Sequence, residues 1–196
     1  MNAEEIRAQL DSKVQRINSQ RNLTGQAKQT MLARAYVEAR DALTQLREQE
    51  VTQVARERQK LERKLFGTTG FNPDPQMVIA RRDAADRAAK LETPAEAEKA
   101  MRRAERDGDA SLAKAIASRA ADWSGDPNWA AIVHQYVADK PAEAETLQAM
   151  QALPNTEDVM WKMSKAMEYG VLAPDGVDMA MADSIARRPL DGDAAA

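Results

Sequence analysis

The chain has 196 residues, of which 43% are hydrophobic and 30% charged, and its formal net charge is −3. That length can bury a substantial core, either as one domain with an appendage or as two small domains, and the hydrophobic content excludes disorder of the whole chain. The sequence holds no cysteine. Disulfides, thiolate metal sites and cysteine nucleophiles are therefore excluded, and an intracellular or particle-internal setting is expected.

The distribution of charge and hydropathy predicts a soluble protein. Residues 1–10 are acidic and polar rather than basic and then apolar, so they predict no secretory signal, and no run approaches the ~18 apolar residues of a membrane span. Residues 1–66 carry 13 Lys and Arg against 9 Asp and Glu. The rest of the chain carries the other 15 of the 28 basic residues and the other 22 of the 31 acidic residues. Because the two signs are interspersed, this offset favours association between unlike surfaces over a nucleic-acid-binding tail.

The sequence predicts an all-α fold, because alternating runs of β-branched residues are missing and apolar residues recur at helical spacing. The first helix is expected over 3–21, with Ile6, Leu10, Val14 and Ile17 on one face. Thr24 then offers an N-cap for a second helix, and Gly25 weakens helix continuity, so a fold-back is expected between the two.

The second helix is predicted over 25–66, a stretch without proline or internal glycine. As one helix it would extend roughly 60 Å, and a first helix folded back on it could cover only about half of that length. An apolar stripe lies along one side of this helix: Leu32, Tyr36, Ala39, Leu43, Leu46, Val54, Leu61 and Leu65. The uncovered part of the stripe predicts a contact with a second copy or another protein. The predicted interface residues are Leu43, Leu46, Val54, Leu61 and Leu65.

The alternative for this helix is a solvated single helix stabilised by charge pairs such as Glu57 with Lys60. Under that alternative the stripe has no partner. The predicted domain arrangement is a helical hairpin or coiled-coil arm over 1–66 and a linker over 67–76, where glycine and proline cluster.

A bundle of short helices is predicted over 77–186, followed by a flexible tail over 187–196. Its helices are announced by a capping residue followed by proline, as in Asp74-Pro75, Thr93-Pro94 and Asp126-Pro127, with Lys140-Pro141 a weaker case. Small residues dominate the apolar positions. The bulkier core is expected from Trp129, Ile132, Val133, Tyr136, Val137, Leu147, Met150, Leu153, Val159, Met160, Met163 and Met167. The methionines are interpreted as adaptable core, with a binding groove as the alternative.

No motif in the sequence marks a catalytic, cofactor or metal site. His134 is the only histidine, so no catalytic triad and no two-histidine metal site can be built without it, and it is interpreted as structural. Neighbouring carboxylates such as Glu96 and Glu98 point to different helix faces. The prediction is a protein without enzymatic activity and without cofactors, although a site shared between subunits stays open.

The densest basic cluster is Arg56, Arg58, Lys60, Arg63 and Lys64. It has two interpretations, a nucleic-acid contact and a salt-bridge rim around a coiled coil. Glu57 and Glu62 interleave with the cluster and no aromatic residue flanks it for base stacking, which favours the rim.

Two Ala-rich stretches carry small residues at helical spacing. One reads Leu23-Thr24-x-x-Ala27-Lys28 and then Leu32-Ala33-x-Ala35-Tyr36-x-x-Ala39-Arg40. The other reads Gly108-Asp109-x-x-Leu112-Ala113-x-Ala115-Ile116-Ala117-x-Arg119-Ala120. They cover under a fifth of the chain and resemble small helical proteins from the structural-gene clusters of tailed phages and prophages. The resemblance implies a virion or assembly component and transfers no functional residue.

The leading prediction is a non-enzymatic structural or assembly protein that acts through helix–helix contacts, as a homo-oligomer or within a larger assembly, in a virion (head, neck or tail) or inside a cell. The alternative is a cellular adaptor or regulator that binds another protein and dimerises through its N-terminal arm. A third prediction is a nucleic-acid-associated protein that uses the basic cluster. No membrane contact is expected.

Overall fold

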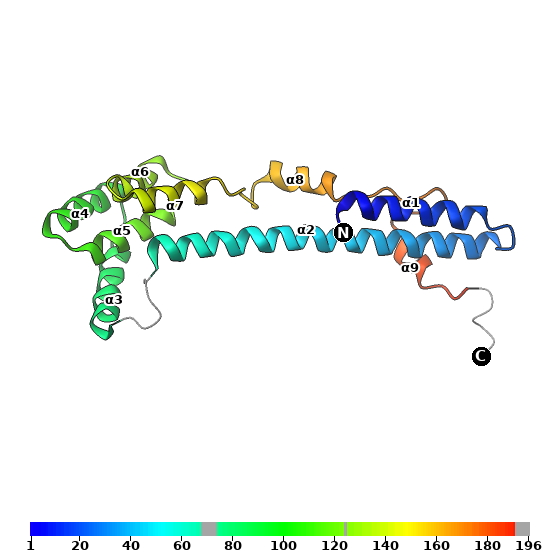
Figure 1. The fold of residues 1–196 in the computed structure, drawn as a ribbon, viewed down its shortest axis with the longest axis horizontal. Helices are drawn as coiled ribbons and strands as arrows, with labels where there is room; N and C mark the ends of the chain where they lie inside the picture. Colours follow the sequence, from blue (N-terminus) through cyan, green and yellow to red (C-terminus); the bar gives the residue numbers. More distant parts are fainter. Residues whose placement is uncertain (68–73, 124, 191–196) are drawn as a thin grey trace. The chain divides into compact units, whose positions relative to one another are not determined.

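The computed structural model describes residues 1–67, 74–123 and 125–190, and within these ranges the chain is helical with no strand. The predicted all-α class is confirmed. The helices, labelled in Figure 1, are α1 (Ala3–Ser19), α2 (Gly25–Phe66), α3 (Pro75–Ala89), α4 (Pro94–Asp107), α5 (Ala110–Ala121), α6 (Pro127–Val137), α7 (Pro141–Gln151), α8 (Val159–Glu168) and α9 (Ala182–Ala186). None of these helices is long and apolar enough to cross a bilayer.

The first two helices begin at the residues that the sequence predicts, Ala3 and Gly25. Asn2 and Glu5 form a reciprocal capping box at the start of α1, which ends at Ser19, two residues before the predicted end. The Thr24 hydroxyl accepts a hydrogen bond from the Ala27 amide (3.1 Å) at the start of α2. These caps satisfy backbone N–H groups that have no partner within their own helix. The predicted bounds of α2, 25–66, agree with the structure.

The chain divides into two compact units, residues 1–54 with the segment from 155 onward, and residues 55–154. In the first unit α1 lies along the N-terminal part of α2 (Figure 1), and the segment after α8 completes the core. Its buried apolar residues are Ile6, Leu10, Ile17, Leu32, Ala33, Ala35, Tyr36, Ala39, Leu43, Val177, Ala182 and Ile185. Residues 155–186, predicted to belong to the bundle, therefore belong to the unit formed by the hairpin.

Two arginines of α2 hold this C-terminal segment by polar contacts. Arg40 forms a bidentate ion pair with Asp183, from Nη1 to Oδ2 (2.7 Å) and from Nη2 to Oδ1 (2.9 Å). Arg34 donates to the Ala186 carbonyl (2.9 Å) and to the Arg188 carbonyl (2.8 Å). The first residues of the predicted tail are thus tied to α2, while 191–196 lie outside the described residues.

In the second unit α5 is the central helix, and it packs against α3, α4 and α6. The core residues of this second unit are Leu65, Ala84, Ala88, Ala97, Met101, Ala104, Leu112, Ala113, Ile116, Ala117, Ala120, Trp129, Ile132, Val133, Tyr136, Val137 and Leu147. The many alanines let helix backbones approach closely. Gly108 ends α4 with φ 70°, a conformation that residues with a Cβ rarely adopt.

The predicted linker over 67–76 is shorter than expected, because Pro75 and Gln76 already belong to α3 and Asp74 caps that helix. Residues 68–73 of the linker lie outside the described residues. Three of the four cap-plus-proline starts carry the expected side-chain hydrogen bond, at Asp74, Thr93 and Asp126, whereas Lys140 makes none.

Candidate interaction surface

The five predicted interface residues on α2 are covered more fully than the sequence suggested. Leu43 is 0% exposed in the core of the first unit and Leu65 is 1% exposed in the core of the second. Both are therefore core residues, and the expectation that they face a partner is corrected. Leu46 is half-buried against the first core, and Val54 and Leu61 are half-buried without belonging to either core cluster. The stripe is thus not an exposed seam.

The basic cluster of α2 is partly engaged within its own unit. Arg58 donates to the Pro154 carbonyl (3.2 Å), Lys60 pairs with Glu57 (3.2 Å), and Arg63 donates to the Gln59 carbonyl (3.3 Å). Of these three contacts, Lys60 with Glu57 is an ion pair and the other two are hydrogen bonds to backbone carbonyls, so the salt-bridge rim around a coiled coil stays a prediction.

The predicted chemistry-bearing residues do not converge. His134 is exposed on α6, and its Nε2 lies 3.4 Å from the Gln151 amide nitrogen. The described residues hold no group of three or more histidine and acidic side chains that could bind a metal ion. Among the described residues, the hydrogen-bond partner of His134 is the Gln151 amide, and no carboxylate is hydrogen-bonded to its ring.

The most unusual surface is the outer face of α8. Four of its apolar side chains are largely exposed: Val159 (74%), Met160 (72%), Met163 (60%) and Met167 (77%). Spacings of three and four residues place them on one side of the helix. The expectation that these residues fill a bundle core is wrong, because none of the α8 residues is buried.

The opposite face of α8 carries the contacts to α2. Trp161, Lys165 and Tyr169 follow one another at intervals of four residues and are half-buried. Glu50 of α2 lies between the last two: the Lys165 Nζ is 2.7 Å from its Oε1, and the Tyr169 hydroxyl donates to its Oε2 (2.9 Å). In addition, the Lys165 Nζ lies 5.8 Å from the centre of the Trp161 ring. A helix normally buries its apolar face, whereas α8 docks through its polar one.

The charges at this contact stabilise each other. Hydrogen bonds to Glu168 and Glu50 raise the pKa of Lys165, so its ammonium form is favoured. The hydrogen bond to Glu50, together with burial, raises the pKa of the Tyr169 phenol. Lys165 is only 17% exposed at its side chain and Glu50 30%, so their attraction is screened less than that of a surface pair.

Both ends of α8 are also fixed. The Asp158 carboxylate accepts a hydrogen bond from the Trp161 amide (2.8 Å) and caps the N-terminus. At the C-terminus, the Arg7 guanidinium of α1 donates to the Glu168 and Gly170 carbonyls, with 3.0 Å from Nη2 to the Gly170 oxygen. A cation there satisfies end carbonyls and complements the helix dipole. Contacts to α1 and α2 therefore hold α8 with its outer face turned to solvent.

Sequence reasoning found the methionines but not the face they occupy. The alternative of a binding groove in the Met-rich stretch stays a prediction. A signal was present in the sequence: Trp161, Lys165 and Tyr169 form a second periodic stripe of amphipathic side chains on α8 and its C-cap residue.

Comparison with known proteins adds no relative to this description, since no family model, no curated protein and no solved structure matches the chain.

Proposed function

We propose that this chain is a non-enzymatic structural or assembly protein that acts through helix–helix contacts, and that the outer face of α8 makes the contact, with the α8 of a second copy as its partner. The observation that carries the proposal is the outward orientation of four apolar side chains on a helix whose polar face and ends are anchored. A rigid apolar helix face is well suited to pack against another helix.

The spacing of the face supports pairing between identical helices. Val159, Met163 and Met167 stand at intervals of four residues, with Met163 at the centre. In an antiparallel pair with a two-fold axis at Met163, Val159 of each copy would face Met167 of the other, as self-complementary contacts in a symmetric dimer require. Met160 would widen the contact with a flexible side chain that adapts to its surroundings.

The size of the face agrees with a modest interface. The four side chains expose roughly 500 Å², in the upper range for an apolar patch on a soluble monomer. Two copies would bury on the order of 1,000 Å² in total, which is the lower bound for a specific interface. The proposed dimer is therefore a weak one by itself, and repeated contacts in an assembly would reinforce it.

The charges around the face do not oppose a second copy. Lys162 pairs with Glu157 (2.7 Å), and Lys165 pairs with Glu168 (2.8 Å) in addition to Glu50. Each α8 thus presents a rim in which acidic and basic side chains are already matched. Like-charge repulsion between two such rims would be small.

The resemblance to helical proteins of phage structural-gene clusters favours a virion component as the setting of this contact. The adaptor alternative requires the same surface to bind a different protein. The nucleic-acid alternative gains no support from the basic cluster, because Arg58 and Lys60 are engaged within their own unit.

The experiment is sedimentation velocity on the wild type and on Met163→Glu, at concentrations up to about 100 µM because an interface of this size is weak. The wild type is expected to shift toward twice the chain mass of 21.6 kDa. Met163→Glu is expected to remain at the single mass, since a charge at the centre of the contact would be desolvated without a partner.

Met179→Glu is the matched control, because Met179 is 56% exposed and lies outside α8. It should dimerise like the wild type. A wild type that stays monomeric throughout, or a Met163→Glu variant that still dimerises, would overturn the α8 pairing. A monomer that captures a different protein through this face would support the adaptor alternative instead.

A further inference from the structure

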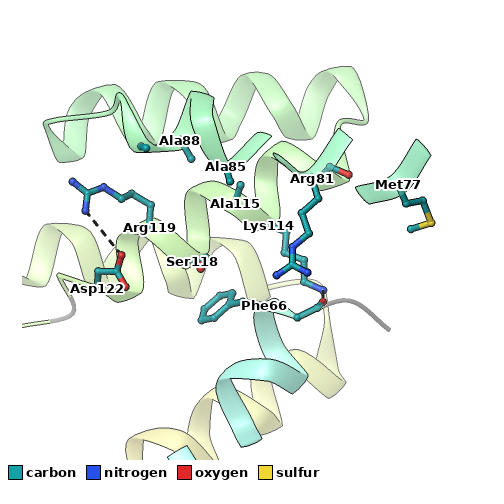
Figure 2. Close-up of a pocket in the computed structure, with 13 residues that line it drawn as sticks. Phe66, Met77, Arg81, Ala85, Ala88, Lys114, Ala115, Ser118, Arg119 and Asp122 are labelled. Carbon is teal, nitrogen blue, oxygen red and sulfur yellow. Dashed lines mark hydrogen bonds and ion pairs between the residues drawn. The ribbon is translucent and has the colours of Figure 1, made fainter. Parts of the chain in front are cut away.

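A second feature, in the unit formed by residues 55–154, is a cavity between α3, α5 and the C-terminal end of α2 (Figure 2). Its volume is about 340 Å³, which is large enough for a small organic molecule. The wall is mostly apolar and is formed by Phe66, Met77, Ala85, Ala88, Ala89 and Ala115. Among the described residues, the charged side chains that line it are Arg81, Lys114, Arg119 and Asp122.

Two cations meet at one end of the cavity. Figure 2 shows the Arg81 and Lys114 side chains converging beside Phe66. The Lys114 Nζ donates to the Gly67 carbonyl (2.8 Å), a neutral acceptor, and Arg81 forms neither an ion pair nor a hydrogen bond with another described residue. Burial, together with the Arg81 charge, lowers the pKa of Lys114, while the Glu143 charge opposes that effect. Within the part of the chain that the structure describes, neither cation is therefore paired with a carboxylate.

The other end of the cavity is nearly neutral. The Arg119 guanidinium lies 4.0 Å from the Asp122 carboxylate and 5.5 Å from the centre of the Trp123 ring. Its Nε is buried without a hydrogen-bond acceptor among the described residues. Burial of an unsatisfied donor is costly, but this atom is closed to solvent and offers no position to a ligand, so the anion is placed at the Arg81 end of the cavity.

We infer that this cavity binds a small molecule with an oxyanionic group, a phosphate or a carboxylate, joined to a compact apolar body. The anion would lie between Arg81 and Lys114, where it relieves their mutual repulsion, and the apolar body would lie against the alanine wall. Charge-assisted hydrogen bonds are strong in partly buried sites of this kind. The inference is independent of the α8 contact, because it rests on residues of the other unit.

The test is titration of the full-length chain with phenyl phosphate, benzoate and benzyl alcohol, followed by isothermal calorimetry and by backbone amide shifts in NMR spectra. Both anions are expected to bind with dissociation constants below about 1 mM and to shift the amides of Ser111 and Ser118, which line the cavity. Benzyl alcohol, with the same ring and no charge, is expected to bind at least about tenfold more weakly. Tighter binding of phenyl phosphate assigns a phosphate ligand, and tighter binding of benzoate a carboxylate.

Arg81→Gln and Lys114→Met should each weaken anion binding at least about tenfold. Arg82→Gln is the matched control, because Arg82 is an exposed neighbour on α3 that does not line the cavity, and it should bind like the wild type. Far-UV circular dichroism verifies that each variant is folded, and Arg81, being exposed, provides the variant that is safest for the fold. No binding by the wild type, equal binding of benzyl alcohol, or equal losses in Arg81→Gln and Arg82→Gln would overturn the inference.

Discussion

Single polar residues hold the C-terminal segment of this chain in place. Glu50 accepts contacts from both Lys165 and Tyr169, and Arg40 holds Asp183 through two bonds. These residues are separated by more than a hundred positions along the chain, so their pairing follows from the fold and not from local propensity. They determine which face of the segment is turned to solvent.

The Arg40–Asp183 pair predicts a specific dependence of stability on pH. The Arg40 guanidinium lowers the pKa of Asp183 below its ordinary value, so the pair stabilises the fold above about pH 4 and this contribution is lost as pH falls below that value. The difference in unfolding midpoint between the wild type and Asp183→Asn is therefore expected to be larger at about pH 7 than at about pH 3. Urea unfolding at the two pH values measures it.

Asp175→Asn serves as the control for that comparison, because Asp175 is exposed and forms no ion pair within the described part of the chain. It should leave the midpoint nearly unchanged at both pH values. An Asp183→Asn deficit of the same size at neutral and acid pH would show that the carboxylate charge is not what stabilises the segment.

Leu43 separates a core role from an interface role. Because its side chain is fully buried, Leu43→Ala is expected to lower the free energy of unfolding by about 2–5 kcal/mol without changing the oligomeric state. Leu172→Ala is the matched control at a position that is 86% exposed, and it should change stability by less than about 0.5 kcal/mol. Chemical denaturation gives both values. Loss of self-association at unchanged stability in Leu43→Ala would contradict the assignment to the core.

At the scale of helices, caps determine where elements begin. The Thr93 hydroxyl accepts from the Glu96 amide (3.3 Å), and the Glu96 carboxylate accepts from the Thr93 amide (3.3 Å), which completes a capping box. The two backbone hydrogen bonds of its carboxylate, from Glu92 and Thr93, lower the pKa of Glu96. The box fixes the start of α4, one of the helices that pack on α5.

Thr93→Ala is expected to lower the free energy of unfolding by about 1 kcal/mol, because the backbone N–H of Glu96 loses its acceptor. Thr93→Ser keeps the hydroxyl and should retain most of the stability. Thermal or urea unfolding of the three proteins provides the comparison. Equal losses in the alanine and serine variants would show that the threonine methyl group, and not the cap, is responsible.

The sequence predicted the helices well and their faces less well. The Thr24 cap marked the start of α2 and the glycine- and proline-rich stretch after Phe66 marked its end, while cap-plus-proline pairs marked α3, α4 and α6. The orientation of α8 could not be predicted, because periodicity finds two stripes on that helix and does not say which one meets α2. The face of α8 that meets α2 is the one whose Lys165 pairs with Glu50, a partner more than a hundred residues away in the sequence. The cavity beside Arg81 could not be predicted either, because it forms only where α3 packs on α5.

At the scale of the whole molecule, the chain consists of two compact units, and each unit contains part of α2, up to residue 54 in the first and from residue 55 in the second. The C-terminal segment returns to the unit that contains the N-terminus, so the apolar stripe predicted to need a partner is largely covered by its own chain. Four of the exposed apolar side chains of the described residues gather on α8, and the proposed contact uses them. The proposed assembly role therefore depends on that helix.

Pairing of α8 across a two-fold axis at Met163 is tested most directly by Met163→Cys, which places one thiol in a chain that has no cysteine. Under mild oxidation the proposed dimer should yield a disulfide-linked species of twice the chain mass on non-reducing gels, since residues at the axis of paired helices approach within bonding reach. Met179→Cys, equally accessible but outside α8, should remain mostly monomeric. Equal cross-linking of the two variants, or none in Met163→Cys, would contradict the proposed contact.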